Sequence, residues 1–226
     1  FMKLKKIASL MLAGIMAVSM LAGCKTGTTT DDENTDVKPV ASNAVAVMND
    51  AQDKVKFDND TDFDAALAAA AKKAAHENVA NAKYEIAEVK DGSVYEELEK
   101  KLDVNAGLVS GGHDIFFNGA TDGAQSGGQS KTLTGLWIVE ADGLTEKAAL
   151  EQVAATMKGK YNNEDEKYPE TVELTDGSYE ASYTGSVSIV TVNTSDEGET
   201  ATAYYIAVSV TQTLARYAQT NVDASK

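Results

Sequence analysis

The chain has 226 residues, a formal net charge of −15 at pH 7 and one cysteine. The acidic balance disfavours binding to nucleic acid and to anionic lipid headgroups, and a lone cysteine excludes a disulfide framework within the chain. A chain of this length forms one large domain or two small ones, whose stability must come from a hydrophobic core.

The start of the chain has the pattern of a secretory signal peptide. Lys3, Lys5 and Lys6 give a positive beginning, residues 7–22 are almost entirely apolar, and small residues come directly before Cys24. This order of charged, apolar and small-residue regions is typical of a cleaved export signal. The apolar run is about 16 residues long, shorter than the ~20 residues of a membrane-spanning helix. A signal peptide over residues 1–23 is therefore favoured over a retained membrane helix.

The sequence LAGC at residues 21–24 resembles the lipobox of bacterial lipoproteins. The resemblance covers residues 2–24. It implies that the sulfur of Cys24 carries a diacylglyceryl group and that the chain is cut before this residue. Two acyl chains hold a protein stably at a membrane, whereas one chain of myristoyl length binds only marginally. The predicted location is the bacterial cell membrane, on its extracytoplasmic side, with the membrane as a partner through the lipid on Cys24.

The segment after the lipobox, KTGTTTDDENTDVKPVA, is rich in Thr and Asp and poor in apolar side chains. Such a composition cannot bury enough surface to fold, so residues 24–41 are predicted to be the lipidated cysteine followed by a flexible tether. Residues 42–226 then form a single domain. A further boundary near residue 142 stays open, although no linker-like composition marks it.

Helical patterns recur through the first part of this domain, at residues 42–57, 61–79, 93–102 and 144–161. Apolar side chains there repeat at spacings of three and four residues. The second of these segments is the strongest because it is rich in alanine, the best helix former. Thr61 with Asp64, and Ser93 with Glu96, have the spacing of a capping box at a helix start.

Strand patterns occupy residues 83–89, 113–119, 133–141, 179–192 and 202–214, with a Gly-rich loop at 124–131. In the last two strands apolar and polar side chains alternate, so that one side of 179–192 is mostly Ser and Thr. The sequence NTSDEGET between them is typical of a turn, which predicts a long antiparallel hairpin. Helices come mostly first and strands mostly last. This order favours an α+β fold, with N-terminal helices packed on a mostly antiparallel sheet that ends in the C-terminal hairpin.

The sequence predicts no metal ion and no cofactor. DNDTDFD at residues 58–64 begins like an EF-hand loop, but Phe63 and Ala69 stand where that loop needs Gly and Glu. The acidic side chains are better explained as groups that favour the start of a helix. The two histidines, His76 and His113, lie in no zinc-binding motif.

A catalytic hypothesis rests on His113 and Asp114, which could act as a base and its orienting acid. The chain would then be a cell-envelope hydrolase, with a serine or another acid brought close by the fold. The alternative is that the sequence Gly-Gly-His-Asp is a polar turn that leads into a strand. The nucleophile motifs G-x-S-x-G and S-x-x-K do not occur.

Phe116, Phe117 and Trp137 lie near the Gly-rich loop in sequence and are the candidate ligand-binding residues. Loops on a rigid scaffold often carry binding sites, but aromatic side chains are also common in a core. The leading hypothesis is a membrane-anchored lipoprotein with a non-catalytic domain that binds a small ligand or an envelope protein. A structural subunit of an envelope complex is the other alternative, and it requires an exposed apolar patch.

Overall fold

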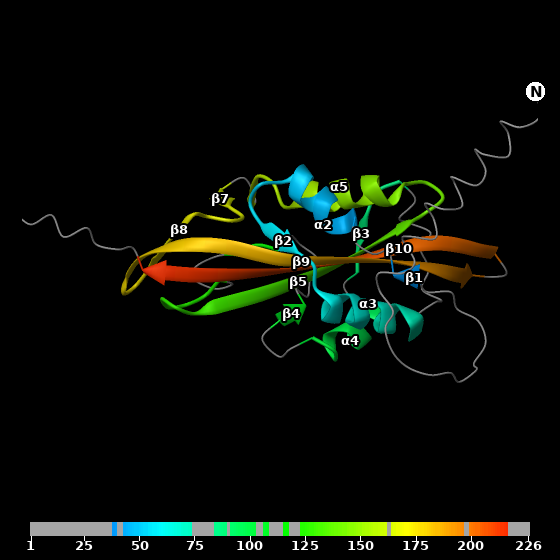
Figure 1. The fold of residues 1–226 in the computed structure, drawn as a ribbon, viewed down its shortest axis with the longest axis horizontal. Helices are drawn as coiled ribbons and strands as arrows, with labels where there is room; N and C mark the ends of the chain where they lie inside the picture. The colour runs from blue at the N-terminus through cyan, green and yellow to red at the C-terminus, as the bar shows by residue number, and fades with distance from the viewer. Residues whose placement is uncertain are drawn as a thin grey trace, which may run out of the picture.

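The structure, a computed structural model, describes residues 38–39, 43–73, 84–89, 91–102, 106–108, 115–117, 123–161, 164–196 and 199–216. Within these residues eight strands form one mixed sheet, and helices cover both of its faces (Figure 1). The described part of the chain therefore has three layers, with the sheet in the middle.

Three long strands form the centre of the sheet. β9 (Gly177–Asp196) and β10 (Glu199–Arg216) make an antiparallel hairpin, and β5 (Ser130–Glu140) pairs antiparallel with the other edge of β10. The predicted hairpin and the α+β class are therefore confirmed. The hairpin is longer at both ends than the sequence pattern indicated.

Short strands extend the sheet at its two edges. Three pair with the outer edge of β9 and two with the outer edge of β5: β1 (Lys38–Pro39), β2 (Lys56–Asp58) and β8 (Thr171–Leu174) on β9, and β3 (Ala87–Glu88) and β4 (Ala106–Leu108) on β5. β2 and β4 run parallel to their partners and the others run antiparallel. A separate small sheet pairs β6 (Lys160–Tyr161) with β7 (Asp165–Glu166). Since β1 lies within residues 24–41, the sheet begins inside the segment predicted as a tether.

Two helices pack on each face of the sheet. α2 (Asn43–Ala51) and α5 (Glu146–Thr156) cover one face, and α3 (Thr61–Lys73) and α4 (Ser93–Glu99) cover the other (Figure 1). α5 lies within the predicted helix 144–161. It follows β5 through a short turn at residues 141–143, where a second domain boundary stayed open, and both elements pack on the same sheet.

Both faces of the sheet are apolar near its middle, and this explains the two helical layers. On β10, Ile206 contributes to the core under α2 and α5, whereas the adjacent Tyr205 contributes to the core under α3 and α4. Both side chains are fully buried. On β9, Val190 and Val192 follow Ser188 on the same side and belong to the second core. The polar side predicted over residues 180–188 therefore becomes apolar toward the β9–β10 turn.

The same face is polar farther from the β9–β10 turn. Hydroxyl groups face each other across β5 and β10, with 2.8 Å between the Oγ1 atoms of Thr132 and Thr211 and 3.0 Å between Ser130 Oγ and Thr213 Oγ1. No helix is needed over this half because its side chains can be solvated. The alternation of apolar and polar residues was thus a correct signal for one half of the hairpin.

The first predicted helix ends early because the side chain of Gln52 forms hydrogen bonds with the backbone groups at the end of the helix. Gln52 Nε2 donates to the carbonyl oxygens of Met48 (3.2 Å) and Val55 (2.7 Å), while Oε1 accepts from the amides of Lys54 (2.9 Å) and Val55 (2.8 Å). These four bonds turn the chain directly after α2 and lead it into β2. The predicted continuation of the helix toward residue 57 is wrong, because Gln52 offers the backbone an alternative to helical hydrogen bonds.

The helix starts also differ from the predicted capping boxes. Asp60, one residue before the predicted cap, accepts hydrogen bonds through Oδ1 from the amides of Asp62 (3.0 Å) and Phe63 (2.9 Å). At α4 the cap is Gly92, with a φ of 92° and no side-chain cap bond, so Ser93 is already inside the helix. An aspartate accepts from a helix start as well as threonine does, and glycine tolerates the left-handed backbone before α4.

Two other strand predictions are only partly met. Among the described residues of 83–89 the strand β3 is two residues long, and the amide of Val89 adds a hydrogen bond to the carbonyl oxygen of Leu136 in β5 at 2.9 Å, whereas residues 115–117 carry no strand pairing. The other residues of the predicted strand 113–119 lie outside those described. β5 begins at Ser130 and so includes the end of the segment predicted as a Gly-rich loop.

A buried polar network joins β10, β9 and the segment before β5. Gln212 is fully buried, donates through Nε2 to Tyr183 Oη at 3.0 Å, and accepts through Oε1 from the amide of Ala124 at 2.8 Å. Tyr183 Oη in turn donates to the carbonyl oxygen of Pro169 at 2.9 Å. Burial raises the pKa of Tyr183 to about 12, with a lesser upward effect from Glu166.

We expect this tyrosine to make the protein lose stability in alkali. The unfolded chain gives up the phenol proton near the ordinary pKa of 10, whereas the folded state holds it until about 12. The contribution of Tyr183 is therefore complete below pH 10 and is lost as the pH rises from about 10 to about 12. Thermal unfolding at pH 9 to 12 should show the melting temperature of the unchanged protein falling more steeply than that of Tyr183→Phe. Tyr84→Phe, at an exposed position, is the control. Parallel curves for the protein and Tyr183→Phe would contradict this.

Candidate ligand-binding cavity

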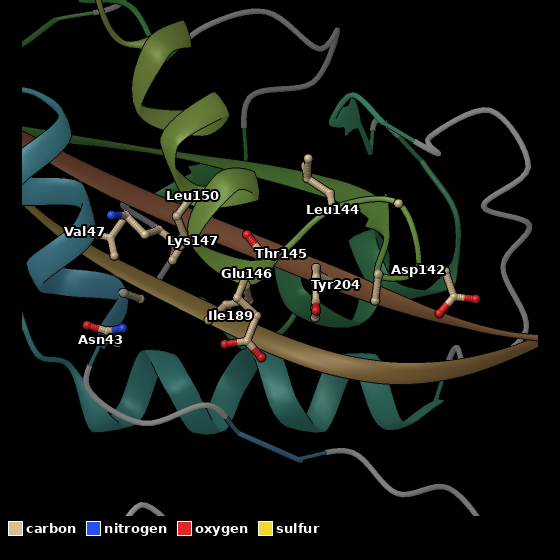
Figure 2. Close-up of a pocket in the computed structure, with 13 residues that line it drawn as sticks. Asn43, Val47, Asp142, Leu144, Thr145, Glu146, Lys147, Leu150, Ile189 and Tyr204 are labelled. Carbon is tan, nitrogen blue, oxygen red and sulfur yellow. The ribbon is translucent and has the colours of Figure 1, made fainter.

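A cavity of about 510 Å³ lies between α2, α5 and the sheet (Figure 2). Its walls come from the first residues of the two helices and from the turn that joins β5 to α5. Ile189 of β9 and Tyr204 of β10 form the part contributed by the sheet. The volume is within the 300–1,000 Å³ of small-molecule sites in proteins.

Local hydrogen bonds fix the turn and the helix on one side of this cavity. The amide of Ala141 donates to the carbonyl of Thr202 at 2.7 Å, which holds the turn against β10. Thr145 is the N-cap of α5, and its Oγ1 accepts from the amide of Ala148 at 3.2 Å. The sequence Leu-Thr-Glu-Lys therefore starts the helix at a fixed place next to the sheet.

The other wall is positioned by Asn49 of α2. Its Nδ2 donates to the carbonyl of Phe57 at 3.0 Å, and its Oδ1 accepts from the amide of the same residue at 2.9 Å. This two-way bond ties α2 to β2, which is itself paired with β9. Both helical walls are thus held by the backbone of the sheet.

The floor of the cavity is apolar. Val47 of α2, Leu150 of α5 and Ile189 of β9 line it, and each is less than a tenth exposed. All three also belong to the core between these helices and the sheet. The cavity is therefore an open hollow whose floor is part of this core.

Two carboxylates and a phenol, those of Asp142, Glu146 and Tyr204, form part of the polar rim of the cavity. Asp142 is exposed, while Glu146 and Tyr204 are half-buried. Burial raises the pKa of Glu146. The pKa of Tyr204 is raised first by burial and then by the negative charges of Glu146 and Asp142. Both carboxylates are therefore close enough to act on the phenol.

One basic residue, Lys147, is also part of the lining. Its Nζ atom lies 3.7 Å from Glu151 Oε1, one turn farther along α5. Within the described part of the chain, neither Asp142 nor Glu146 makes an ion pair. The carboxylates at the rim are thus not neutralised by the lysine beside them.

The lining combines an apolar contact surface with a few polar groups. Among the described residues that form it there is no histidine, cysteine or serine. The described residues also contain no group of three or more His, Cys, Asp and Glu side chains placed to hold a metal ion. An apolar floor under two carboxylates and a phenol is suited to holding a small molecule through contact and charge.

The three aromatic residues predicted to bind a ligand are buried and do not line this cavity. Phe116, Phe117 and Trp137 are 8%, 1% and 3% exposed. The ring of Phe117 lies 5.4 Å from that of Tyr183 between centroids. Trp137 extends over Gly135, where an added Cβ would be 2.4 Å from the indole. Phe117 and Trp137 belong to one core cluster, as expected if these aromatic side chains pack in the core. A ligand-binding role for the three residues stays a prediction.

The other predicted site residues, Cys24, His113 and Asp114, lie outside those described by the structure. The lipidation of Cys24 and the hydrolase hypothesis are therefore untested predictions. Among the described residues, the one large hydrophobic side chain that is exposed is Tyr84. No helix of the described residues has the length and apolar character needed to span a membrane.

Sequence reasoning missed the cavity because its walls are distant in the chain. The segment from Ala141 to Lys147 is the one local signal, since it places an acidic turn and an acidic first helical turn together. Asn43, Ile189 and Tyr204 reach the same place only through the pairing of β9 with β10 and the packing of α2. No alternation pattern within one segment contains that information.

Comparison with known proteins gave no match: no family model, no curated protein and no solved structure corresponds to the chain.

Proposed function

We propose that the protein is a bacterial lipoprotein, anchored at the extracytoplasmic side of the cell membrane by a diacylglyceryl group on Cys24, whose domain binds a small ligand without converting it. The lipobox-like sequence at residues 21–24 supports the anchor. The observation that carries the binding function is the cavity between α2, α5 and the sheet.

The position of β1 supports a site close to the membrane. Lys38 and Pro39 pair with Thr191 and Val190 of β9, next to the cavity residue Ile189. The chain from Cys24 to the start of β1 spans about 50 Å at most, at ~3.5 Å per residue. The chain thus enters the sheet beside a residue of the cavity, so an anchor on Cys24 would hold the cavity near the membrane surface.

The anchor is tested by intact mass spectrometry of the protein extracted from its own membrane. We expect a chain that begins at Cys24 and carries a diacylglyceryl group. Cys24→Ser should lose the lipid and the cleavage because serine has no thiol to acylate, whereas Thr26→Ser should leave both unchanged. A mass that keeps residues 2–23 in the unchanged protein would overturn the lipoprotein proposal.

A further inference from the structure

We infer that the cavity binds an organic cation, a small molecule with an ammonium group and a compact apolar body. This inference rests on the proposed binding function and specifies its ligand class. The same cavity contains the three features that such a ligand requires, namely unpaired negative charge, an aromatic side chain and an apolar floor.

Charge is the first feature. In Figure 2 the ring of Tyr204 lies between Glu146 on one side and Asp142 on the other. Because Glu146 is half-buried, its carboxylate has lost part of its hydration, and burial raises its pKa. A cation in the cavity would compensate for that loss, since charges attract more strongly at a partly buried site than in water.

Lys147 does not serve as this cation. Its ammonium group is 3.7 Å from the carboxylate of Glu151, and both side chains are at least half exposed. That pair lies along α5 rather than across the cavity. The rim therefore has two carboxylates that form no ion pair within the described residues, and the net charge of −15 for the whole chain adds to the attraction of cations.

The apolar and aromatic surfaces are the second and third features. Val47, Leu150 and Ile189 offer an apolar floor for methylene or methyl groups. Tyr204 adds an aromatic side chain next to the carboxylates, and ammonium groups are attracted to aromatic faces. A simple metal ion would make no use of these surfaces, whereas an alkylammonium ion would contact all of them.

An anion is the competing ligand, because α2 and α5 both begin at the cavity and helix starts favour negative charge. At α5 this preference is already met by Glu146, the acidic residue of its first turn. A second anion would be repelled by Glu146 and by Asp142. The partial charge of a helix start is about half an elementary charge, smaller than the two full charges of the carboxylates.

The test compares three molecules with the same six-carbon body and different charge: hexylammonium, hexanol and hexanoate. Binding to the purified lipidated protein in detergent is measured by isothermal titration calorimetry. We expect hexylammonium to bind at least about tenfold more tightly than the other two, as one charge-assisted contact allows. Hexanol or hexanoate binding equally well or better would overturn the inference but leave the binding function intact. If none of the three binds, both the inference and the small-ligand function fail, whatever the state of the anchor.

Two variants locate the interaction. Glu146→Gln keeps the shape of the side chain and removes its charge, so hexylammonium should bind about tenfold more weakly. Glu180→Gln is the control, because this exposed carboxylate of β9 lies outside the cavity and its removal leaves the Lys147–Glu151 pair intact, and its effect should be less than about twofold. Asp142→Asn, in the turn, provides a second rim variant if Glu146→Gln unfolds. Unchanged affinity in folded rim variants would exclude this cavity as the cation site.

Discussion

Gly185→Ala is expected to lower the free energy of unfolding by about 2–3 kcal/mol, although alanine is normally better than glycine in a strand by roughly 0.5–1 kcal/mol. Gly185 lies in the middle of β9, opposite Val210 of β10 and Phe57 of β2. An added Cβ would be 2.7 Å from Phe57 Cε1 and 2.8 Å from the carbonyl oxygen of Ser209.

The clash outweighs the gain in strand preference because neither neighbour can move cheaply. Phe57 is 1% exposed and packed in the core under α2 and α5. The carbonyl of Ser209 belongs to a strand paired on both of its edges, so a shift there would disturb two neighbouring strands. A methyl group at this position therefore either separates β9 from β10 or displaces the ring that ties β2 to the sheet.

Equilibrium unfolding in urea measures this effect. Trp137 is the single tryptophan of the chain and is buried, so its fluorescence reports loss of the core. Thr184→Ala, at the adjacent exposed position, is the control and should change the free energy of unfolding by less than about 0.5 kcal/mol. A Gly185→Ala variant as stable as the unchanged protein, or more stable, would show that β2 and Phe57 do not pack against β9 in this way.

The hairpin could be predicted from the sequence because its signal is local. Side chains in 179–192 and 202–214 alternate with a period of two, and the turn between them has the residues that turns require. Residue pairing follows directly from such a pattern once both strands are known. The amphipathic helices were predictable for the same reason, since their period is contained within each segment.

The three-layer arrangement was not predictable from alternation alone. Residues 187–192 of β9 are apolar at Val190 and Val192 on one side and at Val187 and Ile189 on the other. A strand buried on both faces has a nearly continuous run of apolar residues, and in a short segment such a run does not distinguish a buried strand from a buried helix. Which helix covers which face then depends on contacts between distant residues.

Functional residues were as difficult to predict from the sequence as the layers were, as the aromatic residues and the cavity show. Trp137 is two residues from Gly135 on the same face of β5, and the glycine leaves the space that the indole occupies. The tryptophan therefore fills the core next to its own strand, although its sequence context resembled a ligand face. The cavity, in contrast, is lined by residues from distant parts of the chain, such as Leu150 of α5 and Ile189 of β9. Their meeting in space leaves no mark in any one segment of the sequence.

Substitutions in the floor of the cavity and substitutions at its rim are expected to affect different properties of the protein. Val47, Leu150 and Ile189 belong to the core, so their substitution would lower stability and affinity together. Glu146 and Asp142 lie at the rim and take no part in the core clusters of the described residues. Charge-removing changes at the rim therefore separate ligand recognition from folding.

Gln212→Ala is expected to have the larger effect on stability, about 3 kcal/mol. Gln212 is fully buried, and its loss removes the partners of the amide of Ala124 and of Tyr183 Oη. A buried group left without its hydrogen bond costs about 1–3 kcal/mol, and the cavity left by the side chain adds to this. The network connects β10, β9 and the segment before β5, so its loss weakens three parts of the sheet at once.

Urea unfolding of two variants separates these contributions. Gln212→Met keeps the length of the side chain and fills most of its space but cannot accept from Ala124 as the amide oxygen does. We expect it to remain at least about 1 kcal/mol less stable than the unchanged protein, and to be more stable than Gln212→Ala. Gln129→Ala, an exposed position near the same strand, is the control. If Gln212→Met were as stable as the unchanged protein, the glutamine would act by filling space and its two hydrogen bonds would add nothing. The hydrogen-bonded network would then not explain why a glutamine occupies this buried position of the hairpin.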